Sequence, residues 1–333
     1  MNLFMRETIL EILIGSKDQY ISGEEISSRV GVTRAAVWKT INGLKEDGYI
    51  IKASPRKGYC LIEMPDRLEP SIVREGLKTR TLGKHIYYYR QIDSTNKKAK
   101  ELAIKGKPNG TLIIAEEQTK GRGRLGREWL SPFGTGIWMS ILLRPDIHPW
   151  DAPRMTLLSA AAVARSIEGV TKLKTGIKWP NDIIVGQKKV CGILTEMNGE
   201  LDQLHWIVIG IGINVNGEQK DFPEELHGTA SSLKIELGRP VDRAMLLRRI
   251  CTEMESYLDE FLKSRDFSPV IQECRRRSVT IGKMVRVTGS HDDWVGKAED
   301  IDLDGSLLVR RADGTLERVL SGDVSVRGIA GYI

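Results

Sequence analysis

Two short predicted helices that meet at a tight glycine turn constrain the fold of this chain more than any other feature of its sequence. Ser22 stands three residues before Glu25, the spacing of a capping box, which predicts the start of a helix. Gly31 ends that helix, because a glycine readily takes the left-handed conformation of a helix terminus. Thr33 is a good cap for the next helix, over residues 34–46. An amphipathic helix near the N-terminus precedes this pair.

A short basic hairpin follows the second of these helices. The predicted strands, Tyr49–Ala53 and Gly58–Ile62, surround the turn Ser54–Lys57. Helix, turn, helix and hairpin together make a winged helix-turn-helix, in which the helix after the turn enters the major groove of DNA and the wing holds phosphates. We therefore predict a DNA-binding domain over residues 1–64. Its candidate DNA contacts are Ser22, Thr33, Arg34, Ala35, Trp38, Lys39, Arg56 and Lys57.

A helical domain that serves only as a protein interface is the alternative for this first segment. Its nine basic and eight acidic residues leave it almost neutral, which favours that alternative. The basic residues, however, gather on the helix after the turn and on the wing, which favours DNA.

Strand-like and helix-like stretches alternate over residues 68–278, so we expect an α+β or mixed α/β domain of enzyme size. The expected strands are Thr111–Ala115, Gly136–Leu143, Lys189–Leu194 and Leu204–Gly210. Asp151 is expected to cap a long helix that reaches Ile167, and 241–263 reads as another helix. Over residues 279–333, short alternating strands separated by glycine and aspartate predict a small β-barrel.

Composition excludes several classes of protein. Apolar residues make up 41 % and charged residues 28 %, which fits a folded chain, and the net charge of +6 is too small to identify a partner. The four cysteines are widely spaced, so we expect neither a disulfide framework nor a structural metal. No apolar stretch approaches the roughly 20 residues that span a bilayer, so we expect a cytoplasmic protein without a membrane partner.

The segment Gly121–Arg127, GRGRLGR, is the most informative part of the chain. It matches G-x-G-x-x-G formally, but no strand leads into it and Pro132 opposes a helix after it, so we reject a dinucleotide fold. Three glycines let backbone amides approach an anion, and three arginines supply forked donors for carboxylate and phosphate. An RNA-binding Arg/Gly tract is the alternative, but such tracts repeat and this segment is single.

Two further segments carry residues suited to anionic ligands. In Lys178–Asp182, KWPND, Asn181 and Asp182 are candidates to contact ribose, phosphate or magnesium, although an ordinary turn accounts better for these two residues taken alone. Lys189 lies in an apolar strand, an unusual place for a lysine without a partner. Gly210–Asn214 has two glycines late in a strand, which suits the close approach of a ligand.

These motifs, in this order and together with Asp93–Asn96 (DSTN) and Gln118, resemble the biotin–protein ligases. With the N-terminal winged helix, the chain is similar to the bifunctional bacterial type, which is both ligase and repressor of the biotin operon. The resemblance covers all three segments. It implies a class II synthetase-like central domain and an SH3-like barrel at the C-terminus. It also implies that biotin and ATP form biotinyl-5′-AMP, and that a lysine of the biotin carboxyl carrier protein of acetyl-CoA carboxylase then takes the biotin.

The same resemblance implies roles for particular residues. The ureido ring of biotin would meet Ser94, Thr95 and Gln118, and its body and tail would meet Arg122, Gly192 and Gly210. Lys189 would bridge the biotin carboxylate and the α-phosphate. Arg124 and Arg127 would bind phosphates, and Arg124 would act with Lys189 in catalysis. Other nucleotide contacts would come from Trp129, Ser131, Asn181, Asp182 and Asn214, with Mg²⁺ held by residues that the sequence does not identify.

The resemblance further implies that the adenylate favours a homodimer, which would place two winged helices on the operator of the biotin genes. Two alternatives stay open. One is a repressor that senses the vitamin or its adenylate without catalysis; the other is a related lipoate ligase. Lys189 and the intact arginine segment favour catalysis over sensing, because a sensor needs less charge neutralisation. The winged helix and the glycine–arginine segment favour the biotin enzyme over a lipoate ligase.

Overall fold

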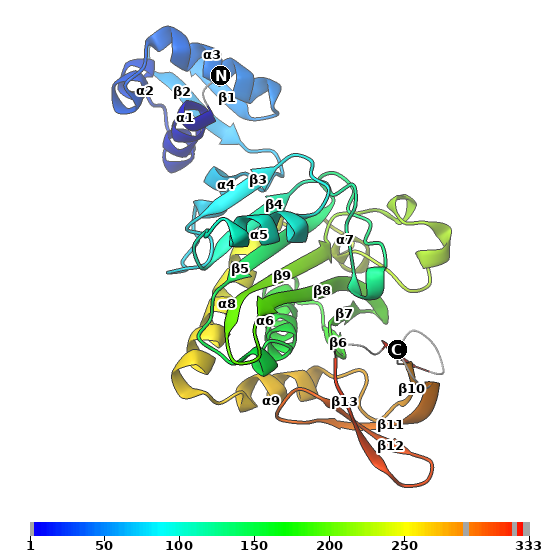
Figure 1. Ribbon diagram of the computed structural model, residues 1–333. Coiled ribbons are helices and arrows are strands. Elements are labelled where there is room, and N and C mark those ends of the chain that lie inside the picture. Colours follow the sequence, from blue (N-terminus) through cyan, green and yellow to red (C-terminus); the bar gives the residue numbers. More distant parts are fainter. Residues whose placement is uncertain (1–2, 289–292, 322–324, 329–333) are drawn as a thin grey trace. The chain divides into compact units, whose positions relative to one another are not determined.

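The computed structural model describes residues 3–288, 293–321 and 325–328 (Figure 1). The chain divides into two compact units, Met1–Leu77 and Lys78–Ile333. Among the described residues, no helix is long and apolar enough to cross a membrane.

The first unit is the predicted winged helix-turn-helix. Its elements are α1 (Leu3–Gly15), α2 (Gly23–Val30), α3 (Arg34–Glu46), β1 (Ile50–Ser54), β2 (Gly58–Glu63) and α4 (Pro70–Arg74). The hydroxyl of Ser22 accepts a hydrogen bond from the Glu25 amide, and Gly31 has a φ of 71°, so the predicted helix start and stop are both confirmed. Thr33 caps α3 in the same way, by accepting from Ala36.

The unit continues past residue 64, where we placed the end of the DNA-binding domain. Arg6 of α1 donates to Asp47 at 2.8 Å and to Glu69 at 2.7 Å. Glu69, directly before α4, is only 4 % exposed. Because these charges are largely removed from water and pair with one another, they bind the segment around α4 to the helical domain.

The second unit is built on a seven-stranded mixed sheet in the order β3-β4-β5-β9-β8-β7-β6. Its strands are β3 (Ile86–Tyr89), β4 (Thr111–Ala115), β5 (Gly136–Leu143), β6 (Gly176–Lys178), β7 (Asp182–Val185), β8 (Lys188–Gly199) and β9 (Leu204–Asn214). The four strands that we predicted are present, and β8 and β9 extend beyond the predicted bounds. All of the pairings are antiparallel except that of β3 with β4.

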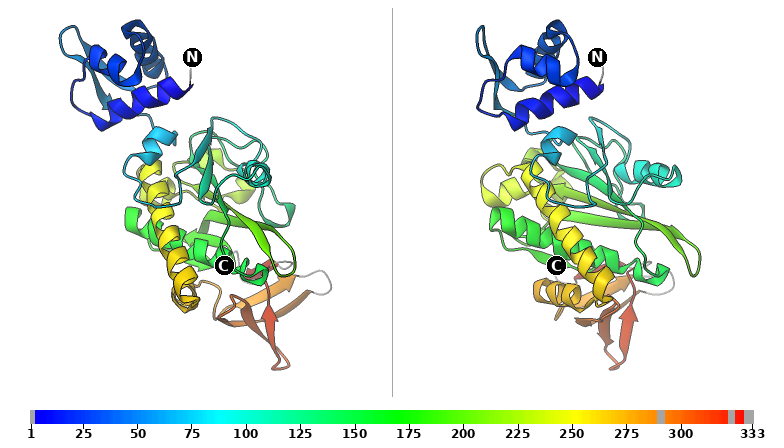
Figure 2. Two further views of the ribbon diagram at one scale, coloured as in Figure 1. Left: turned by 60° about the vertical axis from the view of Figure 1, so that its left-hand side comes forward. Right: turned by 90° about the vertical axis from the view of Figure 1, so that its left-hand side faces the viewer.

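Helices cover both faces of this sheet (Figure 2). The helices of this unit are α5 (Thr95–Ile104), α6 (Arg154–Thr171), α7 (Leu233–Leu237), α8 (Arg243–Ser264) and α9 (Ser268–Arg277). Helix α5 buries Ala99 and Leu102 against Val208 of β9. Ile209, the next residue along β9, points to the other face, where α6 and α8 lie against each other.

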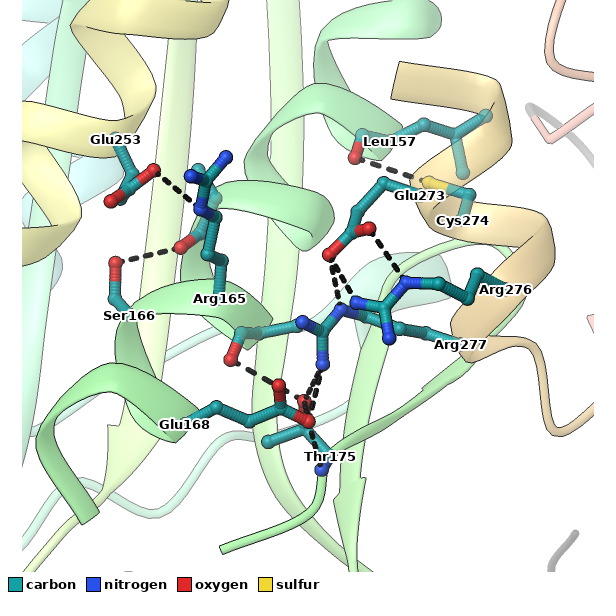
Figure 3. A network of polar contacts seen from close by, with 12 residues as sticks. Leu157, Arg165, Ser166, Glu168, Thr175, Glu253, Glu273, Cys274, Arg276 and Arg277 are labelled. Carbon is teal, nitrogen blue, oxygen red and sulfur yellow. Dashed lines mark hydrogen bonds and ion pairs between the residues drawn. The ribbon is translucent and has the colours of Figure 1, made fainter. Parts of the chain in front are cut away.

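Ion pairs join the helices on the α6 face (Figure 3). Arg277 of α9 pairs with Glu168 of α6 at 2.5 Å and with Glu273 at 2.6 Å. Arg165 of α6 pairs with Glu253 of α8 at 3.2 Å. Burial raises the pKa of Glu168, but hydrogen bonds from Arg277 and Thr175 outweigh this and lower that pKa to about 2. This carboxylate therefore stays ionised and holds the helices together at neutral pH.

One predicted cap is wrong. Asp151 does not cap α6: the cap position is Pro153, and no side chain bonds to the free amides there. Asp151 instead ends a short 3₁₀ turn, Pro149–Asp151, and pairs with Arg154 at 2.8 Å. The carboxylate thus acts on the first turn of the helix as an ion-pair partner rather than as a hydrogen-bond acceptor for its backbone.

The C-terminal strands form a separate antiparallel sheet in the order β13-β12-β11-β10-β14. Their bounds are β10 (Met284–Thr288), β11 (Asp293–Ile301), β12 (Leu307–Arg311), β13 (Leu316–Val319) and β14 (Ser325–Gly328). We expected a closed barrel. Among the described residues the sheet is open, because no pairing joins β13 to β14. Residues 289–292, 322–324 and 329–333, which belong to the segment predicted to form the barrel, lie outside those residues.

Candidate functional site

A cavity of about 530 Å³ in the second unit brings most of the predicted site residues together. It opens on the face of the sheet that carries α5, and the glycine–arginine segment lies along it. The predicted site residues that line it are Ser94, Thr95, Gln118, Arg122, Arg124, Arg127, Trp129, Asn181, Asp182, Lys189, Gly192, Gly210 and Asn214. Ser131 does not line the cavity but accepts a hydrogen bond from Gln118 at 2.9 Å.

Three glycines make room for the cavity in the middle of the sheet. Gly192 of β8 pairs with Gly212 of β9, and Gly210 is on the same face because side chains two residues apart point the same way. A Cβ at Gly212 would lie 2.5 Å from the indole nitrogen of Trp129, and one at Gly210 would overlap the amide oxygen of Asn96. A side chain at either position would displace Trp129 or Asn96, so these glycines serve to leave space and not to allow an unusual backbone conformation.

The glycine–arginine segment is a hairpin loop between β4 and β5, which confirms that it is not a dinucleotide-binding turn. Backbone bonds close it: the Trp129 amide donates to Gly121 and the Gly123 amide donates to Arg127. Leu125 at its tip is 57 % exposed and has a φ of 55°, a left-handed conformation that is costly for a leucine.

A buried ion pair supports the base of this hairpin. Glu116 follows β4, and Arg243 is the first residue of α8; both side chains are fully buried. Arg243 donates to Glu116 at 2.9 Å and to the carbonyl of Gly136, the first residue of β5. The two strands that carry the loop are thus fixed to each other and to α8 at the points where the loop begins and ends.

A bulge in β8 turns Lys189 into the cavity. Cys191 pairs with Ile183 and Lys189 pairs with Ile184, so Val190 is an extra residue. In a regular strand Lys189 would lie on the face opposite Gly192. The bulge brings it to the same face, where a Cβ added to Gly192 would lie 3.2 Å from the Lys189 ammonium. There it pairs with Asp182 at 2.6 Å and lies 5.1 Å from the centroid of the Trp129 ring.

Arg124 joins the loop to two other parts of the unit. One guanidinium nitrogen donates to Asn181 at 3.2 Å, and the other donates to the carbonyl of Ser321 in the C-terminal part. Asn181 in turn donates to Ile193 of β8 at 2.9 Å. This bonding fixes the direction of Arg124, although the loop around it is largely exposed.

The indole nitrogen of Trp129 is a buried donor with no hydrogen-bond partner within the part of the chain that the structure describes. An unpaired buried donor is costly, so its position beside the cavity marks a place where a ligand acceptor would fit. Asn214 is 9 % exposed and already donates to Ser231 at 3.1 Å.

Cys191 is close to this chemistry but is not a candidate nucleophile. Burial raises the pKa of its thiol far above the ordinary range, even though the charge of Lys189 lowers it. The thiol therefore stays protonated and inert at neutral pH.

All eight predicted DNA contacts are exposed in the first unit. Arg34, Ala35, Trp38 and Lys39 share one face of α3, opposite the buried Val37 and Ile41, and Trp38 is 59 % exposed. Ser22 and Thr33 use their hydroxyl oxygens for helix caps. Arg56 and Lys57 lie at the tip of the β1–β2 hairpin.

Sequence reasoning missed two buried polar residues beside the cavity. Asn96 belongs to the DSTN motif, and Ser140 lies within an apolar strand; they are 7 % and 0 % exposed. A serine inside an otherwise apolar run was the available signal for Ser140, since a buried hydroxyl needs a partner.

Comparisons with known proteins find matches for all three segments of the chain. Family models match three segments: an HTH domain over residues 5–60, the biotin/lipoate A/B protein ligase family over 87–214, and the biotin protein ligase C-terminal domain over 280–327. The bifunctional ligase/repressor BirA of Bacillus subtilis (strain 168) is 41 % identical over 97 % of this chain and 98 % of its own. The protein of the same name from Escherichia coli (strain K12) is 30 % identical over 95 % of this chain and 96 % of its own.

Among solved structures, the biotin protein ligase of Aquifex aeolicus in complex with biotin and ATP has a TM-score of 0.64 and 29 % identity. It covers 74 % of this chain and 99 % of its own, a share that leaves part of this chain unmatched. The two relatives named bifunctional ligase/repressor, by contrast, match 97 % and 95 % of this chain. The chain therefore belongs to the family of bifunctional biotin–protein ligases and biotin repressors.

Proposed function

We propose that this protein attaches biotin to a carrier protein in two steps. In the first, a carboxylate oxygen of biotin attacks the α-phosphorus of ATP, the bond to the β-phosphate breaks, and pyrophosphate leaves. In the second, the ε-amine of a carrier lysine attacks the acyl carbon of biotinyl-5′-AMP, loses a proton, and AMP leaves. The observation that carries this proposal is that one cavity gathers Lys189, the glycine–arginine loop and the KWPND segment.

Lys189 reduces the electrostatic repulsion between the two substrates of the first step. Biotin carboxylate and the α-phosphate are both anions, and bringing them together is unfavourable without a cation between them. The bulge in β8 aims the ammonium into the cavity, and Asp182 holds it there. The carrier would be the biotin carboxyl carrier protein of acetyl-CoA carboxylase, because relatives of this chain from Mycobacterium tuberculosis and Paracoccus denitrificans are named biotin–[acetyl-CoA-carboxylase] ligases.

Arg124 and Arg127 bind the phosphates and retain the adenylate. Arg124 is held by Asn181 and by the carbonyl of Ser321, so its guanidinium is already oriented before the nucleotide arrives. The ring of Trp129 packs against adenine. Its indole N–H, which has no partner among the described residues, donates to an acceptor of the ligand. Asn214 lies on the nucleotide side, where its amide donates to the carbonyl of Ser231. Ser131, which we expected on the nucleotide, accepts from Gln118 and so supports the biotin side.

Mg²⁺ would enter with ATP. The described residues contain no group of three or more potential metal ligands from histidine, cysteine or acidic side chains. Nucleotide-bound Mg²⁺ needs only one or two protein carboxylates, since phosphates and water supply its other ligands. Asp182 lines the cavity and has the right chemistry, so the residues present fit the ion, which would neutralise phosphate charge there.

The first unit makes the protein a repressor of the biotin genes. Exposed donors on α3 and on the wing suit base edges and phosphates. Binding of biotinyl-5′-AMP would favour a homodimer, and the two winged helices would then match a palindromic operator. With both activities the protein would work in the cytoplasm, where the carrier and the operator are found.

The test of the ligase is incubation with labelled biotin, MgATP and apo carrier protein. Label that becomes covalently attached to the carrier, with one pyrophosphate released per biotin, is the expected result. A protein that binds biotin but leaves the carrier unlabelled would be the non-catalytic sensor, and one that labels the carrier from lipoate instead would be a lipoate ligase.

A further inference from the structure

A chain of buried polar side chains runs from the cavity to the surface of the sheet. It begins at Thr95 and passes through Ser140 of β5 and Asn96 of α5 to Glu196 of β8, which pairs with Lys100 at 2.7 Å. Thr95, Ser140 and Asn96 are 3 %, 0 % and 7 % exposed. None of these groups except Thr95 has a role in the proposed reaction.

The orientation of Asn96 is fixed by its partners. Its amide nitrogen donates to the carbonyl of Leu194 at 3.3 Å and to the carboxylate of Glu196 at 2.8 Å. Both partners can only accept, so the amide cannot be turned around. Its oxygen is therefore the atom that faces Ser140, in the space left by the missing side chain of Gly210.

This orientation determines where the Ser140 proton goes. Ser140 Oγ lies 2.6 Å from Asn96 Oδ1 and 2.8 Å from Thr95 Oγ1, but it carries a single proton. Asn96 Oδ1 can only accept, and two oxygens at 2.6 Å need a proton between them, so Ser140 donates to Asn96.

The Thr95 hydroxyl can then only accept a hydrogen bond from a group in the cavity, and cannot donate one to it. Its hydroxyl proton has two acceptors within reach, Ser140 at 2.8 Å and the side-chain oxygen of Gln118 at 3.0 Å, and both are protein atoms. Gln118 is oriented as well, because its oxygen takes the Thr95 amide N–H at 2.8 Å. Its nitrogen donates to Ser131 and keeps one further N–H.

We infer that Asn96, with Ser140 and Glu196 behind it, is a specificity-determining residue that makes the cavity read one edge of a cyclic urea or amide. Thr95 accepts from a ligand N–H, and Gln118 donates to the neighbouring carbonyl. A ring without an N–H, such as a dithiolane, leaves both protein groups unpaired. This inference rests on the proposed function, in which the ureido ring of biotin lies here, and it adds the residues that set the polarity of that contact.

The experiment measures biotin binding by calorimetry for the wild type, Asn96→Asp, and the double variant Asn96→Asp with Glu196→Gln. Aspartate keeps the shape of asparagine and the oxygen that accepts from Ser140, but it cannot donate to Glu196 or Leu194. Its carboxylate is repelled by that of Glu196, so it leaves the position that asparagine holds beside Ser140. We expect biotin binding to weaken about 30-fold, since leaving buried groups unpaired costs about that much. In the double variant, the new amide at position 196 donates to the new carboxylate at position 96, so we expect at least about a fivefold recovery of biotin affinity.

Several controls separate this role from a loss of folding. Glu101→Gln removes an exposed partner of Lys98 on the same helix, and its biotin affinity should equal that of the wild type. ATP affinity should stay unchanged in every variant. If Asn96→Asp does not fold, Ser140→Ala breaks the same chain with a smaller change, and we expect about a tenfold loss of biotin affinity.

The possible failures are distinguishable. If the wild type gives no heat with biotin, the proposed function fails and the inference fails with it. Suppose instead that the wild type binds biotin, and that folded Asn96→Asp binds it with an affinity within about threefold of the wild-type value, or that the double variant recovers no affinity. The proposed function then stands, but the role of Asn96 in setting the polarity of the contact is wrong.

Discussion

Replacing Lys189 with methionine should slow adenylate formation at least about 100-fold. Methionine keeps the length of the side chain and removes the charge. The Lys189 ammonium is 2.6 Å from Asp182 in a site where the two side chains are 23 % and 14 % exposed, so water screens the charge only in part. Loss of one donor aimed at developing charge in such a site costs about 2.7–4 kcal/mol, or a factor of about 10² to 10³ in rate.

The measurement is single-turnover pyrophosphate release with saturating biotin and MgATP. The control is Lys188→Met, which makes the same change one residue earlier on the opposite face of β8 and should leave the rate unchanged. Lys189→Met should also lower the free energy of unfolding by about 1–3 kcal/mol, because Asp182 loses its cation. A folded Lys189→Met variant that forms adenylate within about threefold of the wild-type rate would refute the role of the ammonium.

Three further outcomes follow from the structure. Arg124→Gly should form biotinyl-5′-AMP but release it, because the guanidinium that Asn181 and Ser321 orient is lost; dialysis that retains adenylate at the wild-type level would count against this. Arg56→Ala and Lys57→Ala should each lower the slope of log K against log salt for operator binding by about 1, and an unchanged slope in gel shifts would remove the wing from the interface. Because the pKa of Glu168 is about 2 in the fold against an ordinary value of 4.5, its contribution to stability is complete above pH 4.5 and is lost as the pH falls toward 2. Glu168→Gln should therefore flatten the acid limb of the stability curve, as followed by denaturant unfolding, and an equally steep limb would contradict the assignment.

Local sequence signals predicted the first unit well because its elements depend on nearby residues. Caps at Ser22 and Thr33 and the stop at Gly31 act within one helical turn. The apolar spacing of α3 then fixes which face is buried, and hence which side chains can meet DNA.

The sequence predicted which residues belong to the central site, but not how their side chains are arranged. The residue types of the glycine–arginine loop and of KWPND indicate anion binding wherever they lie. The bulge at Val190 was not predictable, because nothing in the local pattern of β8 distinguishes an extra residue from a regular one. Without it, the alternation of side chains would place Lys189 on the wrong face.

Contacts between distant residues were also beyond sequence reasoning. Glu116 and Arg243 form a fully buried pair across 127 positions, and Asn96 meets Glu196 across 100. Each partner alone looks like a surface charge or a turn residue. The open C-terminal sheet is a similar case, since the alternation of its residues predicts strands but not whether their edges meet.

Native mass spectrometry after incubation with biotin and MgATP, followed by rapid desalting, tests the central claim most directly. If the oriented arginine and the ammonium in the cavity make and hold the activated vitamin, the protein should carry the mass of biotinyl-5′-AMP, and that mass should disappear when apo carrier is added. A protein that emerges with biotin alone, or with nothing bound while unreacted ATP remains, would contradict the account.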